Sequence, residues 1–573
     1  MNQTSRTDDT LHHPGWNQNP PPLNADETTR QDLNGIANAR EQRDHTPQAT
    51  CPGDGSLQSD ILPVPQDRDD RPVRKGSTGL VLAASAADQP ADRSKALTVR
   101  CSVPWFLRPL VKFAAFVGPG FLIAVAYIDP GNYSTDVAAG AQSRYALLFV
   151  VFMSNVFAIF IQSLCIKLGS VTGLSLAENC RLHFPKWLVI ILYIFAESAI
   201  VATDIAEVIG SAIALNLLLK IPLVAGCVIT LADVLFLLAF YRPNGSMWGL
   251  RAFEFFVMAL VLGVVICFCI QLSMLRDESV GEVFRGYLPS ATVVKGDGLY
   301  QSCGILGATV MPHSLFLGSG TVQPRLKEFD VNQGYFDDSA SLTDDAEDSS
   351  YRPSIHAIRG CLKYSIIELT LSLFTFALFV NSSILIVAAA DLYGTPGAAN
   401  ADLFGIYSLL STSIAPIAGT IFALALLLSG LSAGIVCTIA GQIVSEGMIR
   451  WTLKPWVRRL LTRSISIIPS VIVAGAVGRE GLNTALTATQ VVLSVILPFV
   501  VAPLVYFTCR NRYMTVQVDA RTAPDGTVGE DGPQTETVKM RNSWPVAVLA
   551  VLVWLVITVL NVALLVLVGL GDA

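Results

Sequence analysis

Long apolar segments follow one another from about residue 113 of this chain almost to its end. A helix needs about 20 predominantly apolar residues to cross the hydrocarbon core of a bilayer, and it satisfies its backbone hydrogen bonds internally. The sequence therefore predicts an all-α polytopic membrane protein with about eleven transmembrane helices, of which the ninth is short. The predicted spans are 113–138, 145–168, 187–219, 222–240, 253–273, 299–320, 363–390, 415–448, 464–478, 484–508 and 544–569. A stretch at 403–414 predicts an additional interfacial helix.

Charged residues are scarce outside the N-terminal part of the chain. They form 15% of all residues, against about 25% in soluble domains, and 25 of the 84 lie within residues 1–100. This distribution excludes a soluble enzyme. No basic stripe indicates a nucleic-acid partner, and no P-loop supports an ATP-driven pump. The eleven cysteines have no paired spacing, which argues against a disulfide framework or a zinc ribbon.

Polar and apolar segments divide the chain into five parts. Residues 1–105 lack apolar periodicity and any run typical of a signal peptide, so we expect a disordered cytosolic tail that offers sites to regulatory or sorting proteins. Residues 106–273 and 298–508 are expected to form two halves of five spans each. A cytosolic loop at 509–543 and a last span with the C-terminus at 544–573 complete the chain.

Lysine and arginine are distributed unequally between the two sides of the predicted membrane protein. With the N-terminus inside, the inner loops carry twenty of these residues and the outer loops six. Because cytoplasmic loops are enriched in Lys and Arg, this predicts a cytosolic N-terminus, and the odd number of spans places the C-terminus outside. The acidic insertion at 328–350 is expected to be a solvated, regulatory segment. Plasma, endosomal and vacuolar membranes all stay open as locations.

The first and sixth spans are interrupted by proline and glycine. The first contains Gly118-Pro119-Gly120 and then Asp129-Pro130-Gly131-Asn132, and the sixth contains the sequence GATVMPH at 307–313. Proline removes a backbone donor and clashes with the preceding turn, so both helices should break within the membrane. Irregular backbone at that depth persists only where it is buried or lines a cavity. Two breaks five spans apart predict a five-plus-five inverted repeat with a site near the midplane.

Residues at the two breaks offer a mixed set of metal ligands. Asp129 is ionisable and lies deep in an apolar run, and Asn132 adds a neutral carbonyl oxygen. The proline and glycine between them free backbone carbonyls around Ala126, which are hard oxygen ligands. Met311 at the other break adds a thioether, so the set favours Mn²⁺, Fe²⁺, Co²⁺ or Cd²⁺ over Ca²⁺ and Mg²⁺. His313 is the only histidine within a span.

Each of these residues also has an ordinary structural explanation. Met311 could fill the core, His313 could bond a neighbouring helix, and Asp129 could cap the broken helix. Their joint occurrence at two repeat-related breaks favours a functional site. Gln490 in the tenth span could face the same pathway or bond another helix.

The third span carries three acidic residues, Glu197, Asp204 and Glu207. At 100° per residue they lie within about 80° of one another on one helix face. Acids along a membrane helix favour a proton route, because burial favours the neutral form of a carboxyl group. The alternative is a polar seam bonded to neighbouring helices, to which Asp233 or Glu368 would contribute.

Four separated motifs resemble, in this order, the natural resistance-associated macrophage protein (Nramp) family of proton-coupled divalent metal transporters. They are GPGFLIAVAYIDPGN at 118–132, ATDIAEVIG at 202–210, GATVMPHS at 307–314 and AGQIVSEG at 440–447. The resemblance extends over residues 113–508 and implies a LeuT-like fold with alternating access. Relatives that carry magnesium or aluminium, or that only signal, depart at the aspartate–asparagine or methionine–histidine positions, and this chain keeps all four.

The resemblance also assigns roles residue by residue. The positions that match the family's metal ligands are Asp129, Asn132, Met311, the carbonyls of Ala126 and Ala308, and Gln490, which joins the site in some conformations. The positions that resemble the proton-linked set are Asp129, His313, Asp204 and Glu207, with Glu197 as a further polar position and Arg463 as a basic residue on the inner route.

We therefore predict a secondary-active transporter, not an enzyme, that imports Mn²⁺ and/or Fe²⁺, and also Co²⁺ or Cd²⁺, by proton symport. These ions and protons are its cargo, and no permanently bound cofactor is expected. An amino-acid transporter of the LeuT fold and a membrane metal sensor without turnover are the competing hypotheses. An intramembrane hydrolase is disfavoured because Asp129 and His313 have no evident nucleophile. The preference between Mn²⁺ and Fe²⁺, the proton stoichiometry and the oligomeric state stay open.

Overall fold

The computed structural model describes residues 118–239, 247–275, 279–295, 297–336, 351–395, 402–450, 455–476, 478–518 and 536–570. The tail predicted at 1–105 lies outside these residues. Of the insertion at 328–350, residues 337–350 also lie outside them. The prediction of a solvated segment is wrong for Asp330, which is buried in a helix and accepts hydrogen bonds from Tyr351 and Ser354.

Within the described residues, each of the eleven predicted spans coincides with helix; the start of the first span, 113–117, lies outside them. In chain order they are α2 (Pro119–Val125) with α3 (Pro130–Ser143), α4 (Leu148–Thr172), α6 (Lys186–Leu219), α7 (Leu223–Ala239), α8 (Met247–Met274), α10 (Asp297–Thr309) with α11 (Pro312–Gly320), α13 (Ile355–Ser372) with α14 (Leu378–Leu392), α16 (Pro416–Ile449), α17 (Pro455–Ala476), α18 (Gly478–Thr508) and α19 (Trp544–Leu570). A π-helical turn, η4 (Leu373–Ala377), joins α13 to α14, and the predicted interfacial helix is α15 (Leu403–Ser413). The all-α membrane fold is therefore confirmed.

By length and composition alone, eight helical stretches among the described residues are suited to cross a membrane. The number is smaller than eleven because α3 and α4 form one continuous stretch through the 3-10 turn η1 (Arg144–Leu147). In addition, α7 has 17 residues, and the apolar part of α17, Arg463–Ala476, is also short.

Proline produces both helix breaks at the predicted positions. The first break separates α2 from α3, which begins at Pro130, and the second separates α10 from α11, which begins at Pro312. A proline at the first helical position fits because that residue has no intrahelical donor role. Both breaks are buried, as irregular backbone within a membrane must be.

The contacts between spans repeat when each span is exchanged for the one five positions away. The first span packs on the seventh, through the contacts of α2 with α13 and of α3 with α14. The equivalent pair is the sixth span on the second, in which α10 and α11 pack on α4. Similarly, α6 contacts α7 and α18, while α16 contacts α17 and α8. This exchange is what a five-plus-five inverted repeat produces.

The buried core gathers around α6 and α16, which are equivalent in the two halves and contact each other extensively. Their interface includes small residues, among them Gly430, whose added Cβ would overlap the Ser211 side chain. Small residues let membrane helices approach closely, because packing rather than a hydrophobic force between helices drives their association.

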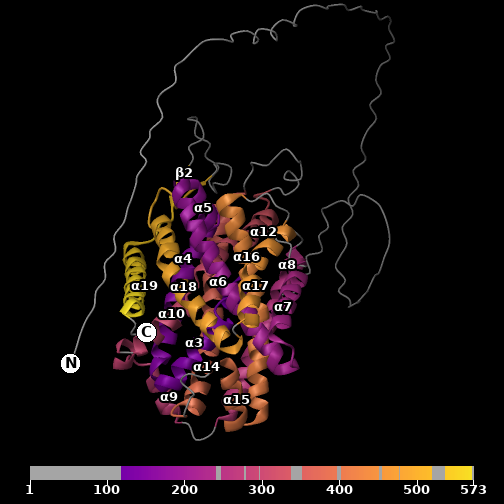
Figure 1. Ribbon diagram of the computed structural model, residues 1–573. Coiled ribbons are helices and arrows are strands. Elements are labelled where there is room, and N and C mark those ends of the chain that lie inside the picture. The colour runs from indigo at the N-terminus through magenta and orange to yellow at the C-terminus, as the bar shows by residue number, and fades with distance from the viewer. Residues whose placement is uncertain are drawn as a thin grey trace, which may run out of the picture. The chain divides into compact units, whose positions relative to one another are not determined.

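Loops predicted on opposite sides of the membrane lie at opposite ends of the bundle (Figure 1). One end carries α5 (Leu176–His183), α12 (Gln323–Gln333) and the antiparallel strands β1 (Thr515–Val518) and β2 (Glu536–Lys539). The other end carries α9 (Val280–Gly286) and α15. The two strands form part of the segment expected to be a loop at 509–543. That the end with the strands faces the cytosol stays a prediction.

Gly169 of α4 tests the packing of the second span against the sixth. A Cβ at this position would overlap the backbone oxygen and carbon of Ser319 in α11, which cannot rotate away as a side chain can. We expect Gly169→Ala to destabilise the protein by about 1–3 kcal/mol, the usual range for overpacking, and to lower its thermal unfolding temperature in nanodiscs. Gly569→Ala is the matched control, because no atom lies within 4 Å of the added methyl group. Equal unfolding temperatures for the two variants would contradict this packing.

Candidate metal and proton site

Asp129 is the N-cap of α3 and is fully buried. Its carboxylate accepts hydrogen bonds from the backbone N–H groups of Gly131 and Asn132, both at 3.1 Å. The side-chain amide of Asn132 donates to the same carboxylate at 2.7 Å and to the Tyr127 carbonyl at 3.2 Å. These bonds leave the amide oxygen of Asn132 buried and without a partner among the described residues. Asp129 therefore does cap a helix, and its carboxyl group still lies beside an unused oxygen.

The prolines at the two breaks explain why Ala126 and Ala308 are candidate carbonyl ligands. In an α-helix each carbonyl accepts from the N–H four residues later. For Ala126 that residue is Pro130, and for Ala308 it is Pro312, and neither proline has an N–H. The two carbonyls thus lose their helical donors for the same reason. The neighbouring carbonyls of Tyr127 and Ile128 instead accept from side chains, the latter from the Ser429 hydroxyl at 2.5 Å.

A buried polar bridge connects the two breaks. The Tyr127 hydroxyl lies 3.0 Å from the Ser314 hydroxyl oxygen, and Ser314 donates to the Met311 carbonyl at 2.7 Å. The Gln162 amide donates to both hydroxyl groups, at 2.9 and 2.7 Å. Met311 is fully buried and immediately precedes α11. Met311 therefore belongs to the buried region that this bridge connects to the Asp129 break.

Gln490 of α18 lies against the first break. A Cβ added to Gly131 would overlap the Gln490 amide nitrogen and would come within 2.8 Å of the Asp129 carboxylate. Gln490 is 2% exposed, and its amide oxygen has no hydrogen-bond partner among the residues that the structure describes. Of the two explanations open for Gln490, this position favours the pathway.

The oxygens gathered at the breaks suit a cation. One carboxylate, two amide oxygens without partners and two carbonyls without helical donors lie in or beside the interrupted backbone. Buried polar groups normally have hydrogen-bond partners, so the unused acceptors call for an explanation. Coordination of a metal ion satisfies acceptors that no protein donor reaches.

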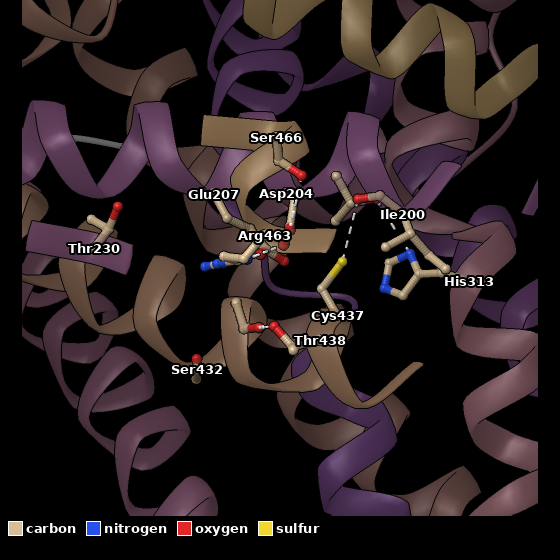
Figure 2. A network of polar contacts seen from close by, with 12 residues as sticks. Ile200, Asp204, Glu207, Thr230, His313, Ser432, Cys437, Thr438, Arg463 and Ser466 are labelled. Carbon is tan, nitrogen blue, oxygen red and sulfur yellow. Dashed lines mark hydrogen bonds and ion pairs between the residues drawn. The ribbon is translucent and has the colours of Figure 1, made fainter. Parts of the chain in front are cut away.

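Asp204 and Glu207 of α6 share one cation, the guanidinium of Arg463 from α17 (Figure 2). Arg463 Nη1 donates to an Asp204 oxygen and lies 3.4 Å from Glu207 Oε2, and the Ser466 hydroxyl donates to the other Asp204 oxygen at 3.0 Å. Arg463 is 1% exposed, so these charges are removed from solvent together. Figure 2 also shows Cys437 beside the cluster; its Sγ lies 3.5 Å from the Ile200 carbonyl.

His313, at the second break, contacts the helix that carries this cluster. Its Nδ1 lies 3.3 Å from the hydroxyl of Thr203, the residue immediately before Asp204. His313 therefore bonds a neighbouring helix, and the bonded residue adjoins the acidic pair. This position is compatible both with a structural bond to a neighbouring helix and with the proton-linked role that the resemblance implies.

Glu197 lies apart from the cation-bound pair. It is half-buried, and its Oε2 has no partner among the described residues. Glu368, considered above as a partner for this seam, instead accepts the N–H groups of Gly118 and Gly120 at 2.6 and 3.0 Å. The side chain of Asp233 lies outside the described residues. Asp204 and Glu207 therefore pair with Arg463, the basic residue that the resemblance placed on the inner route, and Glu197 does not.

The structure identifies polar residues that sequence reasoning missed. Asp136 of α3 is fully buried, with neither carboxylate oxygen paired to a described residue. Its spacing from Asp129, seven residues on the same helix, could have indicated it. Arg325 and Glu254 form a buried ion pair at 2.5 Å beside the start of α2, and a Cβ on Gly118 would come within 2.8 Å of Arg325. The first turn of α2 therefore lies beside this ion pair and donates its backbone N–H groups to Glu368.

Comparison with known proteins identifies the family of this chain. The sequence model of the Nramp family, described as natural resistance-associated macrophage protein-like, matches residues 120–523. The chain belongs to the Nramp family. Its architecture, with broken first and sixth spans, is the LeuT-like fold that the resemblance implied.

Relatives of this Nramp chain are named for the metals they transport. It is 54% identical to the manganese transporter pdt1 of Schizosaccharomyces pombe over 460 residues, which cover 80% of this chain and 86% of that one. It is 50% identical to the iron transporter SMF3 of Saccharomyces cerevisiae, covering 80% and 96%. Among solved structures, the manganese transporter of Eremococcus coleocola, in complex with an aromatic bis-isothiourea substituted compound, matches with a TM-score of 0.65 at 32% identity, covering 81% and 88%.

Arg463 should be essential to the stability of this Nramp chain. Removing the partner of a buried charge costs about 3–5 kcal/mol, whereas an exposed pair contributes about 0–1 kcal/mol. We expect Arg463→Leu to lower the unfolding temperature strongly and Arg251→Leu, which breaks the partly exposed pair with Glu328, to change it little. Adding Asp204→Asn and Glu207→Gln to Arg463→Leu should recover part of the loss. Equal effects of the two single variants, measured by thermal unfolding in nanodiscs, would refute the shared-cation arrangement.

Proposed function

We propose that this protein imports Mn²⁺ and/or Fe²⁺, with Co²⁺ and Cd²⁺ as further cargo, into the cytosol by proton symport with alternating access. The observation that carries the proposal is the convergence of the Asp129 carboxylate and unused oxygens at the first break, beside the break that holds Met311. One negative charge with neutral oxygens and a thioether suits a divalent transition ion. The metals named for the relatives support the same cargo class.

The geometry at α3 disfavours the competing amino-acid transporter. In LeuT-type transporters, the N-terminus of a half-helix receives the carboxylate of the substrate. Here the N–H groups of Gly131 and Asn132 already bond the Asp129 side chain. An amino-acid carboxylate would have to displace that carboxylate and would be repelled by it. A metal cation instead is attracted to the Asp129 charge.

Alternating access in this proposal depends on the independence of the half-helices. Helix α2 has seven residues and is separated from α3 by the break, so it can move without unwinding the rest of the span. The backbone N–H groups at the start of α2 bond Glu368, and they lie beside the Arg325–Glu254 pair. Polar contacts of this kind can open and reform, whereas a packed core is displaced only at high cost. These contacts are the candidates for the inner gate.

The proton route in this proposal runs along α6. His313 and Thr203 connect the metal region to Asp204 and Glu207, and Arg463 balances the charge of the acidic pair. A proton that enters this pair changes how strongly it holds Arg463, which couples protonation to the position of α17. We assign Asp129 to both cargoes, because it lies at the proposed metal site and the buried polar bridge connects its break to the break that holds His313.

Asp129→Ala should abolish metal uptake, because it removes the only charge among the proposed ligands. We expect Mn²⁺ uptake into proteoliposomes to fall to the level of empty vesicles. Asp402→Ala is the matched control, since Asp402 caps α15 through the Gly405 N–H at 2.7 Å and is remote from the breaks in the chain. Full uptake by Asp129→Ala would contradict the proposed site. Mn²⁺ binding to the native protein without any uptake would support the metal sensor instead.

Met311→Ala should weaken the exclusion of Ca²⁺ more than it weakens Mn²⁺ transport. The thioether is a ligand that Mn²⁺ and Cd²⁺ accept and Ca²⁺ does not, so its loss leaves an all-oxygen site. We expect Ca²⁺ uptake, or competition by Ca²⁺ against Mn²⁺, to become measurable. Met448→Ala, which truncates a buried methionine of α16, should leave the discrimination unchanged. Unchanged exclusion of Ca²⁺ by Met311→Ala would show that sulfur does not set the selectivity.

A further inference from the structure

A cavity of about 570 Å³ lies at the end of the bundle that carries α5, α12 and the strands (Figure 1). Its wall is formed by residues of α4, α5 and α12, by the start of α13 and by both strands. Ligand pockets in proteins commonly have volumes of about 300–1,000 Å³. The cavity is therefore large enough for a small molecule, and its wall shares no residue with the proposed metal and proton site.

Three basic side chains line this cavity, and they come from three different segments. His183 belongs to α5, Arg352 precedes α13, and Arg512 lies between α18 and β1. Neither arginine forms an ion pair with a residue in the described part of the chain. Partial burial and the nearby charge of Arg512 lower the pKa of His183. The cavity therefore presents positive charge that no acidic side chain of the described residues neutralises.

Asp330 is the one acidic residue among those that line the cavity. Its carboxylate already accepts hydrogen bonds from the Tyr351 hydroxyl at 2.6 Å and from the hydroxyl and the backbone N–H of Ser354 at 2.5 and 2.9 Å. Asp330 is also 1% exposed. Three donors thus hold this carboxylate within the wall, and Arg352 stays free for a ligand.

An aromatic cluster holds two of the basic side chains in place. The Tyr513 ring lies 4.6 Å from the His183 ring, and the Arg512 guanidinium carbon lies 5.8 Å from the same Tyr513 ring. Phe507 is fully buried and packs against both Tyr513 and His183, at 5.1 and 5.8 Å between ring centroids. A cation within about 6 Å of an aromatic ring is attracted to its face. Side chains positioned in this way lose less conformational entropy when they bind a ligand.

Exposed tryptophans indicate how the cavity lies relative to the bilayer. Trp187 at the start of α6 is 63% exposed, and Trp544 at the start of α19 is 78% exposed. Tryptophan is enriched at the membrane–water interface. His183 precedes Trp187 by four residues, and Thr537 of the cavity wall precedes Trp544 by seven. The cavity therefore lies near the headgroup layer, on the side predicted to be cytosolic, where soluble molecules and lipid headgroups both reach it.

We propose that this cavity binds a small anion with two or more phosphate groups, either free in the cytosol or as the headgroup of a lipid. The planar guanidinium of arginine binds phosphate through two parallel hydrogen bonds. Arg352 and Arg512 stand on different segments of the wall, so each can hold a separate phosphate group, and His183 adds a ring N–H donor. The same side chains repel metal cations. A bound polyphosphate joins β1 to the start of α13.

The test uses inositol trisphosphate as the soluble probe and phosphatidylinositol bisphosphate as the lipid probe. The trisphosphate is titrated calorimetrically into the metal-free full chain in phosphatidylcholine nanodiscs, and we expect saturable binding. Thermal unfolding is then compared between nanodiscs that contain the bisphosphate lipid and nanodiscs that contain phosphatidylserine at equal total charge. A higher unfolding temperature with the bisphosphate lipid identifies a headgroup as occupant, because a ligand of the folded state stabilises it. Binding of the trisphosphate without this stabilisation identifies a free molecule.

Arginine variants separate the cavity from general attraction of anions to a basic surface. Arg352→Gln and Arg512→Gln should each weaken the trisphosphate about tenfold, the loss expected for a charge-assisted hydrogen bond. Both side chains are exposed, so the unfolding temperature without ligand should stay unchanged. Arg510→Gln is the matched control, because Arg510 lies over the Tyr506 ring at 4.3 Å and does not line the cavity. Its affinity should equal that of the native protein.

Three results would overturn the proposal. The first is the absence of trisphosphate binding together with equal unfolding temperatures in the two lipids. The second is an equal loss of affinity in Arg510→Gln and in the two cavity variants. The third is binding that occurs only after the acidic residues of segment 337–350 are replaced by Asn and Gln, since this segment would then be the occupant. Binding is measured without metal, so these results do not depend on whether the protein transports it.

Discussion

Two missing backbone N–H groups determine where the first and sixth spans break and why both breaks must be buried. Pro130 and Pro312 lack the donors that the carbonyls of Ala126 and Ala308 would use in a continuous helix. In a bilayer such acceptors cannot turn to water, so the two breaks must be enclosed by protein. The inverted repeat provides the enclosure by packing each broken span against a span of the other half. A pair of prolines thereby produces a buried site that is rich in oxygen and poor in donors.

Most buried charged residues among the described residues have a hydrogen-bond or ion-pair partner. Arg463 serves two carboxylates, and Arg325 pairs with Glu254 near the start of α2. Asp129 is held by backbone and amide donors without a cation. Asp136 of α3 is also buried without a protein cation, so Asp129 is distinguished by the unused oxygens beside it, and this is where the metal ion is proposed to bind.

Local pattern predicted the spans, both breaks and the residues at them, because hydrophobic runs and proline act within a few residues of the chain. It did not predict the pairing of Arg463 with Asp204, since the two are 259 residues apart and Arg463 also fits the inner-side bias of basic residues. The contact of Glu368 with the α2 backbone spans 250 residues and was missed for the same reason. The strand pair in the segment 509–543 was missed because each strand has only four residues.

A divalent metal ion and protons are proposed to move together through this site. Recording Mn²⁺ entry and internal pH simultaneously, in proteoliposomes with an acidic exterior, tests this coupling directly. We predict that Mn²⁺ accumulation and acidification of the interior follow the same time course, and that Ca²⁺ produces neither. Mn²⁺ accumulation with no change of internal pH would contradict proton symport, and the absence of any Mn²⁺ entry would contradict the transport function itself.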